Sequence, residues 1–346
     1  MLSVLRNVSV NQRNIHYISR KPFKEVSIPV PWGKIAGKWW GSTKIKPIIC
    51  LHGVQDNCGS FEPLVVFLNK KENFSFLAID FPGHGYSSRF PGGLFYHFFT
   101  YPMVVKRICD YFKWQNVSLM GHSLGAITSF TFTILYPEKV KFLICIDALH
   151  PFTTTVNAET LRKSIDLLMK YDDMKSSENM SAAYSLQEAI EKMYNGYENA
   201  IKLERIPILL ERNLSPSKNF PGKYYFSRDP KLKMKVMCDW PQEQVIKDSS
   251  LITQPIFVCK ARHNMYYGPK EHFYSVMDVL KKNSKDCDFH YVDGTHYVHL
   301  NDPEDVGAYI QKFLEKHYKA EQSNLDENSS VFCDSHPGLL EMISKQ

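Results

Sequence analysis

Residues 116–125 read NVSLMGHSLG and decide the fold. An apolar run at 116–120 leads into the G-x-S-x-G pattern at 121–125, and a helix-forming stretch follows. This pattern is typical of a sharp strand-to-helix turn that strains the serine backbone and lifts its hydroxyl above a sheet. A Cβ at either glycine would collide with neighbouring backbone. We therefore predict that Ser123 is a nucleophile, against the alternative of an ordinary turn with a capping serine.

Short apolar runs recur along the chain, with helical patterns between them. Runs of this length suit strands that are buried on both faces of a mostly parallel sheet. The expected strands are Lys24–Val30, Lys34–Trp40, Pro47–Leu51, Phe74–Ile79, Asn116–Met120, Lys141–Ile146, Pro255–Cys259 and Asp288–Val292. The expected helices are Phe61–Asn69, Tyr101–Phe112, Leu124–Leu135 and Pro303–Lys316. The alternation predicts an α/β fold with an eight-stranded sheet covered by helices on both faces.

The alternation stops between about residues 151 and 251. This stretch has helical patterns at Glu159–Tyr171, Leu186–Tyr194 and Glu198–Asn213, and no convincing strand. We expect an inserted helical cap over the carboxyl ends of the strands, where sheets of this class bind ligands. The expected core then comprises residues 25–150 and 252–320.

The two ends of the chain differ in charge. Residues 1–24 contain no Asp or Glu and carry Arg6, Arg13, Arg20, Lys21 and Lys24. This composition fits either a mitochondrial targeting segment or a solvated tail, and it lacks the continuous apolar stretch of a secretory signal. Residues 321–346 are rich in acidic and small polar residues, and we expect a mobile tail there.

Overall composition excludes several classes of function. The 346 residues are 44% hydrophobic and carry a net charge of +6, of which the N-terminal segment supplies all but about +1. The remainder has no basic field for nucleic acid, and the apolar runs are too short for a transmembrane helix. Eight cysteines are too sparse for a disulfide scaffold, and none has C-x-x-C spacing. We therefore expect no cysteine-based zinc site and a reducing compartment, cytoplasmic or mitochondrial rather than secreted.

A serine nucleophile needs a base, which in this arrangement follows the last strand. Two histidines follow Asp288–Val292, namely His296 and His299. We favour His296 because it lies closer to the end of the strand, whereas His299 lies one helical turn later and serves for packing or hydrogen bonding. His84, in a Gly- and Pro-rich loop, precedes the serine, and we interpret that loop as structural.

The carboxylate that orients the base has two candidate positions in the sequence. The usual loop after the strand that follows the cap, residues 260–267, has no Asp or Glu and carries Asn264 where an aspartate is expected. The other solution is the end of the strand Lys141–Ile146, where Asp147 follows. We predict Asp147, with capping of the next segment as its alternative role.

An oxyanion requires backbone N–H donors near the serine. One should come from Leu124, at the start of the helix after the nucleophile. The other should come from Val54, in the loop after the strand Pro47–Leu51.

Over about residues 25–320 the chain resembles the α/β-hydrolase superfamily, and within it the animal serine hydrolase-like proteins, a group that includes insect kraken. Beyond the elbow, the resemblance rests on IPVPWGKIAGKWWG (28–41), LHGVQDN (51–57), YYFSRD (224–229) and GTHYVHL (294–300). It implies a serine hydrolase in which Ser123 and His296 match the family pattern and Asn264 departs from it. Ser123 argues against the epoxide hydrolases and haloalkane dehalogenases, which share the fold but use an aspartate nucleophile.

The sequence thus predicts an esterase that works through an acyl-enzyme and requires no metal or organic cofactor. Leu167, Leu168, Met169 and Tyr194 suggest apolar walls in the cap, which favours uncharged, lipophilic esters. The alternatives are a ligand-binding protein with weak or absent catalysis, and a lyase or C–C bond enzyme that uses the same serine.

Overall fold

The computed structural model describes residues 22–70, 73–153, 157–172, 182–234, 240–323, 325 and 329–334. Most of the expected targeting segment, residues 1–21, lies outside the described residues, and the first strand begins at Phe23. Within the described part of the chain, no helix combines the length and the apolarity that crossing a membrane requires.

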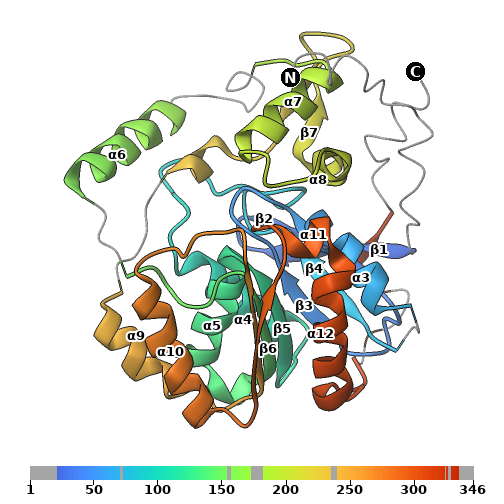
Figure 1. Cartoon of the computed structure of the whole chain (residues 1–346). Coiled ribbons are helices and arrows are strands. Elements are labelled where there is room, and N and C mark those ends of the chain that lie inside the picture. Colours follow the sequence, from blue (N-terminus) through green and yellow to red (C-terminus); the bar gives the residue numbers. More distant parts are fainter. Residues whose placement is uncertain are drawn as a thin grey trace.

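A nine-stranded sheet forms the centre of the molecule, in the order β10-β9-β6-β5-β3-β4-β2-β1-β11 (Figure 1). Its strands are β1 (Phe23–Val30), β2 (Gly33–Trp40), β3 (Ile48–Leu51), β4 (Phe76–Ile79), β5 (Val117–His122), β6 (Val140–Ile146), β9 (Ile256–Ala261), β10 (Cys287–Val292) and β11 (Phe332–Cys333). The six strands from β10 to β4 are parallel, and β2, β1 and β11 are antiparallel to their neighbours. All eight predicted strands are present, so the predicted fold class is confirmed.

Helices cover both faces of the sheet, because its central strands bury apolar side chains in both directions. One face packs against α4 (Thr100–Tyr111), α5 (Leu124–Leu135), α9 (Gln242–Ser249) and α10 (Lys270–Asn283). The other packs against α3 (Glu62–Leu68), α11 (Val298–Asn301) and α12 (Pro303–His317). The sequence analysis did not predict α9 or α10.

Part of the C-terminal segment, where we expected a mobile tail, packs against the sheet, and residues 335–346 lie outside the described residues. Strand β11 pairs with β1, and Val331 is fully buried. Ser323 is also buried, and its N–H donates to the carbonyl of Lys44. These contacts add the ninth strand to the sheet. A two-residue strand has no period that a sequence pattern could reveal.

The expected cap contains α6 (Ala158–Asp172), α7 (Leu186–Gly196) and α8 (Ile206–Asn213). The prediction that it lacks strands is wrong, since β7 (Leu214–Pro216) pairs with β8 (Tyr224–Phe226). The predicted helix over 198–213 is also shorter than expected. Glu198 and Asn199 have positive φ angles, and Pro207 lies in the first turn of α8. Because α9 packs on the core helix α10, we propose the segment from α6 to β8 as the cap.

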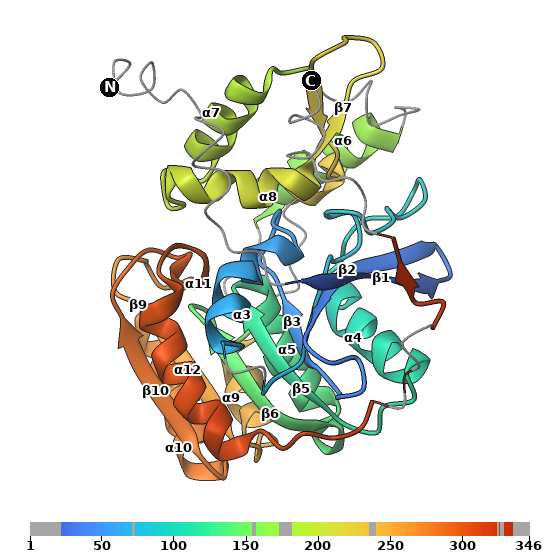
Figure 2. The same cartoon turned by 90° about the vertical axis from the view of Figure 1, so that its right-hand side faces the viewer.

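The cap lies beyond the carboxyl ends of the parallel strands, with α7 and α8 next to α11 and α3 (Figures 1 and 2). A buried ion-pair group fastens α8 to the core. The Arg212 guanidinium donates to Asp80 at 2.7 and 2.9 Å and to Glu25 at 2.5 Å. Breaking such a buried group by removing one partner typically costs about 3–5 kcal/mol. The interaction therefore fixes α8 above the end of the sheet.

Candidate active site

Ser123 lies at a strained turn between β5 and α5. Its φ and ψ angles are 52° and −117°, in a region that non-glycine residues rarely occupy. A Cβ on Gly121 would lie 2.2 Å from the backbone of Gly125, and a Cβ on Gly125 would lie 1.8 Å from the carbonyl oxygen of Leu51. Both glycines are therefore required by close backbone packing. The geometry is that of the nucleophile elbow expected from the sequence.

His296 and Asp147 form a hydrogen-bonded pair beside this turn. His296 follows β10, Asp147 follows β6, and the distance from His296 Nδ1 to Asp147 Oδ2 is 2.5 Å. The Asp147 side chain is completely buried, and its residue also has a positive φ, of 54°. Asp147 is thus the carboxylate that the structure places against His296.

Asn264 lies in the same group rather than replacing the carboxylate. Its Nδ2 atom donates to Asp147 Oδ2 at 2.5 Å and lies 3.1 Å from His296 Nδ1. The two positions converge because β6 and β9 are parallel neighbours, so the residues that follow them meet at one edge of the sheet. Asparagine at 264 therefore supports the Asp147 carboxylate with a donor.

Lys260 is a further partner of Asp147 that the sequence analysis missed. Its buried ammonium lies 2.7 Å from Asp147 Oδ1, which also accepts the N–H of Ala261 at 2.7 Å. The buried carboxylate consequently accepts from four donors, so its oxygens are fully hydrogen-bonded. The sequence feature that could have identified Lys260 is its position inside an otherwise apolar strand.

Tyr267 contacts both Ser123 and His296. Its hydroxyl is 3.1 Å from His296 Nε2, the nitrogen that would take a proton from Ser123. Burial raises the pKa of Tyr267, and hydrogen bonds with Asn264 and Ser123 oppose that rise. The phenol therefore remains protonated at neutral pH and bridges Ser123 to His296. No sequence pattern singled out this residue.

The loop after β3 brings Val54 close to Ser123. A Cβ on Gly53 would lie 3.3 Å from the Cβ of Ser123, and neither Val54 N–H nor Leu124 N–H has an acceptor among the described residues. Gln55 has a φ of 60°, and its N–H donates to His84 Nε2 at 3.0 Å. His84 thus holds this loop in place, in keeping with the structural role that we expected. The two free N–H groups can serve as donors to an oxyanion.

His299, the rival candidate, lies apart from the His296–Asp147 pair. It is fully buried, and its ring centre is 4.0 Å from that of His122. Burial lowers the pKa of His299 to about 3, so its imidazole is neutral at physiological pH. The base expected from the sequence, His296, is the histidine that pairs with the carboxylate.

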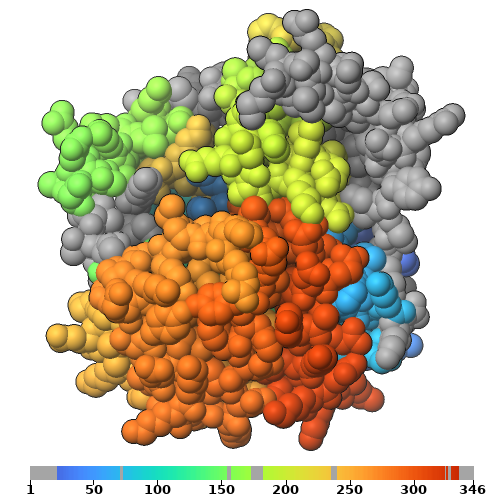
Figure 3. Space-filling model, in the orientation of Figure 1, coloured from blue at the N-terminus to red at the C-terminus, as the bar shows by residue number. Residues whose placement is uncertain are grey.

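The surface of the molecule is hollowed beside the cap. Figure 3 shows this hollow between α6, in green, and the yellow-green segment that contains α7, above the orange residues that follow the cap. A small pocket also borders the group, lined by Asp147, Lys260, Tyr266, Tyr267, Phe273 and Ile127 among others. Its lining is mainly apolar and aromatic, apart from His150 and the Lys260–Asp147 pair.

A parallel sheet with helices on both faces and a serine at a strained strand-to-helix turn defines the class of α/β hydrolases. The family model described as alpha/beta hydrolase fold matches residues 46–303, and the chain belongs to this family. Its relatives include a "Probable serine hydrolase" of Drosophila melanogaster, which is 33% identical over 307 residues, covering 87% of this chain and 91% of the relative. A "Serine hydrolase-like protein" of Danio rerio is 32% identical, over 86% of this chain and 90% of its own.

Among solved structures, a hypothetical protein from Pseudomonas aeruginosa PAO1 is similar with a TM-score of 0.69. It is 26% identical and covers 84% of this chain and 98% of its own. These likenesses confirm the predicted resemblance and support a hydrolase.

Proposed function

We propose that this protein is a serine hydrolase that cleaves carboxylic esters through an acyl-enzyme intermediate. The observation that carries the proposal is the 2.5 Å bond between His296 Nδ1 and Asp147 Oδ2 beside a serine on a strained turn. In this proposal Asp147 fixes the tautomer of His296 with the proton on Nδ1, which leaves Nε2 as the base. Ser123 is the nucleophile.

The reaction proceeds in two halves. Ser123 Oγ attacks the ester carbonyl carbon while His296 Nε2 takes the hydroxyl proton, and the N–H groups of Val54 and Leu124 hold the oxyanion. Collapse of the tetrahedral intermediate expels the alcohol, which leaves with the proton from His296. A water molecule then attacks the acyl-enzyme with His296 again as base. This step releases the carboxylic acid and restores Ser123.

The position of Tyr267 requires a movement before the first step. Its hydroxyl occupies the hydrogen-bonding position of His296 Nε2, so Ser123 gains direct access to the base only when that hydroxyl leaves. The loop that carries it is exposed at Met265 and contains Gly268 at a φ of 128°. We propose that substrate entry displaces Tyr267.

Replacing Tyr267 with phenylalanine should therefore raise activity. The hydroxyl bond to His296 is worth about 0.5–1.5 kcal/mol, so its loss should increase kcat/KM for a short p-nitrophenyl ester about 2- to 12-fold. The matched control is Tyr266→Phe, because the Tyr266 hydroxyl lies in the same loop but contacts Tyr291 at 2.8 Å. A tenfold fall in Tyr267→Phe alone would contradict the displacement and make the phenol part of the proton transfer.

We propose uncharged, lipophilic esters as the substrate class. Support comes from α6, in which Leu161, Ile165 and Met169 expose 45%, 51% and 60% of their surface, and from the mainly apolar pocket beside Asp147. The experiment is a series of p-nitrophenyl esters of increasing acyl length. Because burying one methylene is worth about 0.8 kcal/mol, kcat/KM should rise about fourfold per methylene until the pocket is full. Hydrolysis of no ester above the rate in buffer would contradict the proposed function.

The second candidate is a ligand-binding protein with weak or absent catalysis. The Tyr267 hydroxyl favours this candidate, because its contact with His296 Nε2 blocks the nitrogen that would act as the base. Under this candidate, Tyr267→Phe would bind esters without hydrolysing them. The ester series and the tyrosine variant together separate the two functions.

A further inference from the structure

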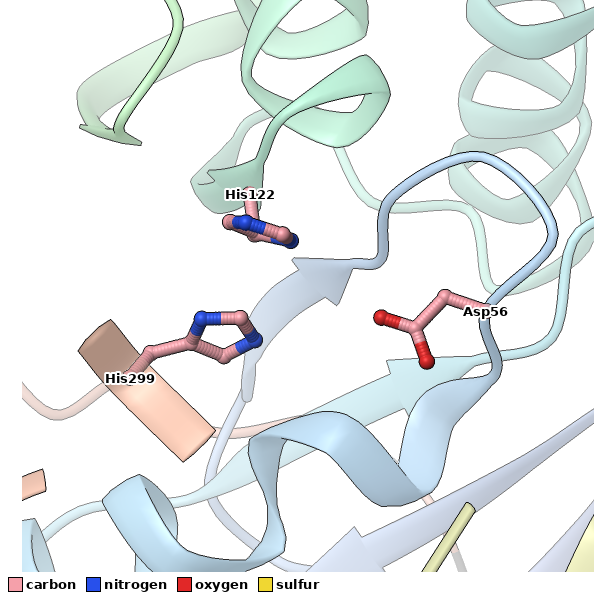
Figure 4. A group of neighbouring side chains, drawn as sticks. All are labelled: Asp56, His122 and His299. Atoms are coloured by element: carbon pink, nitrogen blue, oxygen red, sulfur yellow. The ribbon is translucent and has the colours of Figure 1, made fainter. Parts of the chain in front are cut away.

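Three buried side chains meet behind the nucleophile elbow. Asp56 follows β3, His122 ends β5, and His299 lies in α11. All three are completely buried, and each offers one ligand atom within 4.8 Å of those of the other two. Figure 4 shows the carboxylate and the two imidazole rings pointing toward one another from three separate segments. The proposed ester hydrolysis uses none of these side chains.

Their polar atoms are not satisfied by the described residues. Asp56 Oδ1 accepts the N–H of Asn57 at 2.8 Å, whereas Asp56 Oδ2 has no partner. The Ser60 hydroxyl lies close to this carboxylate, has no other partner, and is a donor available to it. His122 Nδ1 and both nitrogens of His299 are also unpartnered. Buried polar groups without hydrogen-bond partners are rare, so these unpartnered atoms indicate a ligand-binding site.

Most of the unpartnered atoms are hydrogen-bond acceptors, which favours a positively charged ligand. His122 Nε2 lies 2.9 Å from the carbonyl oxygen of His296 and must donate to it, which leaves Nδ1 as a bare lone pair. A neutral His299 adds one acceptor and one N–H donor, and Asp56 Oδ2 adds a third acceptor. Three acceptors therefore face two donors, the second being the Ser60 hydroxyl. A cation can satisfy all three acceptors at once.

We propose that Asp56, His122 and His299 bind a divalent transition-metal ion of the zinc class. Two neutral imidazoles and one carboxylate form a common donor set for such ions. The His122 bond to a backbone carbonyl is the outer contact that orients metal-ligating histidines. Zinc bonds of about 2.0–2.1 Å bring tetrahedral ligand atoms to roughly 3.4 Å from one another, so binding draws the three side chains inward. The ion would join the oxyanion loop, the elbow and the loop of the base, and its role is structural.

The test is metal binding by the full-length protein, independent of activity. Metal-free protein is titrated with CoCl₂ and followed by its visible absorption, and metal content is measured by mass spectrometry after ZnCl₂ loading and gel filtration. We expect about one ion per chain and a higher Tm with zinc. Ser123→Ala should bind equally well, which separates this site from the proposed function.

The variants Asp56→Asn and His299→Gln should each weaken Co²⁺ binding by more than about tenfold. The matched control is His290→Gln, because His290 is partly exposed in β10, lies 2.7 Å from Asp288, and is not in the group. Circular dichroism identifies variants that fail to fold, and one folded ligand variant is sufficient. Absence of a stoichiometric ion from folded wild-type protein, or equal binding by both ligand variants, would overturn the proposal and leave ordered water as the occupant.

Discussion

Replacing Ser123 with alanine should reduce the hydrolysis of p-nitrophenyl esters by roughly 10⁵- to 10⁶-fold, the scale seen when a serine protease loses its nucleophile. The reason is that no covalent intermediate can form, while the oxyanion donors of Val54 and Leu124 remain. Steady-state kcat/KM, measured at substrate concentrations well below KM, gives the loss directly.

A suitable control is Ser129→Ala. Ser129 lies in α5, the helix that follows Ser123, and its hydroxyl donates to the carbonyl of Gly125 at 2.9 Å, away from the base. This variant should retain activity within a few-fold. Wild-type turnover in Ser123→Ala would remove Ser123 as nucleophile and leave the elbow without a catalytic role.

Asp147→Asn should lower kcat by about 10⁴-fold, because an amide no longer selects the His296 tautomer that leaves Nε2 free. It also brings a donor toward Lys260 and Asn264, which both donate to this carboxylate. Thermal unfolding therefore accompanies the kinetics, so that a loss of folding is not mistaken for a loss of orientation.

The double variant Asp147→Asn/Asn264→Asp is the sharper experiment. Asn264 Nδ2 lies 3.1 Å from His296 Nδ1, so a carboxylate at 264 would come within reach of the same nitrogen. The double variant should be at least about tenfold more active than Asp147→Asn. A double variant no more active than the single one would show that position 264 cannot orient the base. Full activity in Asp147→Asn alone would remove Asp147 from the mechanism.

Local patterns were sufficient to predict the sheet and the elbow. The run Ile48–Leu51 is apolar throughout, and Val140–Ile146 is apolar apart from Lys141, as central parallel strands require. The glycines at 121 and 125 identified the turn because only residues without a Cβ fit there. These features depend on a few neighbouring residues and are readable in the chain.

The choice between Asp147 and position 264 depended on tertiary structure. The two residues are 117 positions apart and meet only because β6 and β9 are neighbours in the sheet. Tyr267 was missed because its hydroxyl reaches His296 through the path of an irregular loop. The pairing of Lys260 with Asp147 likewise follows from strand order, which no local period encodes.

The short strands β7, β8 and β11 were missed for another reason. Each has two or three residues, fewer than a period-2 pattern needs to be recognised. Their pairing follows from the partners that the rest of the fold places beside them.

The central claim is that Ser123 is activated by the His296–Asp147 pair. The most direct measurement is peptide mass spectrometry of the wild-type chain after reaction with a fluorophosphonate probe, which captures only an activated nucleophile. The account predicts one adduct per chain, on Ser123, and none in His296→Ala. An adduct on another residue such as Tyr267, or an unmodified Ser123 in protein that hydrolyses esters, would contradict it.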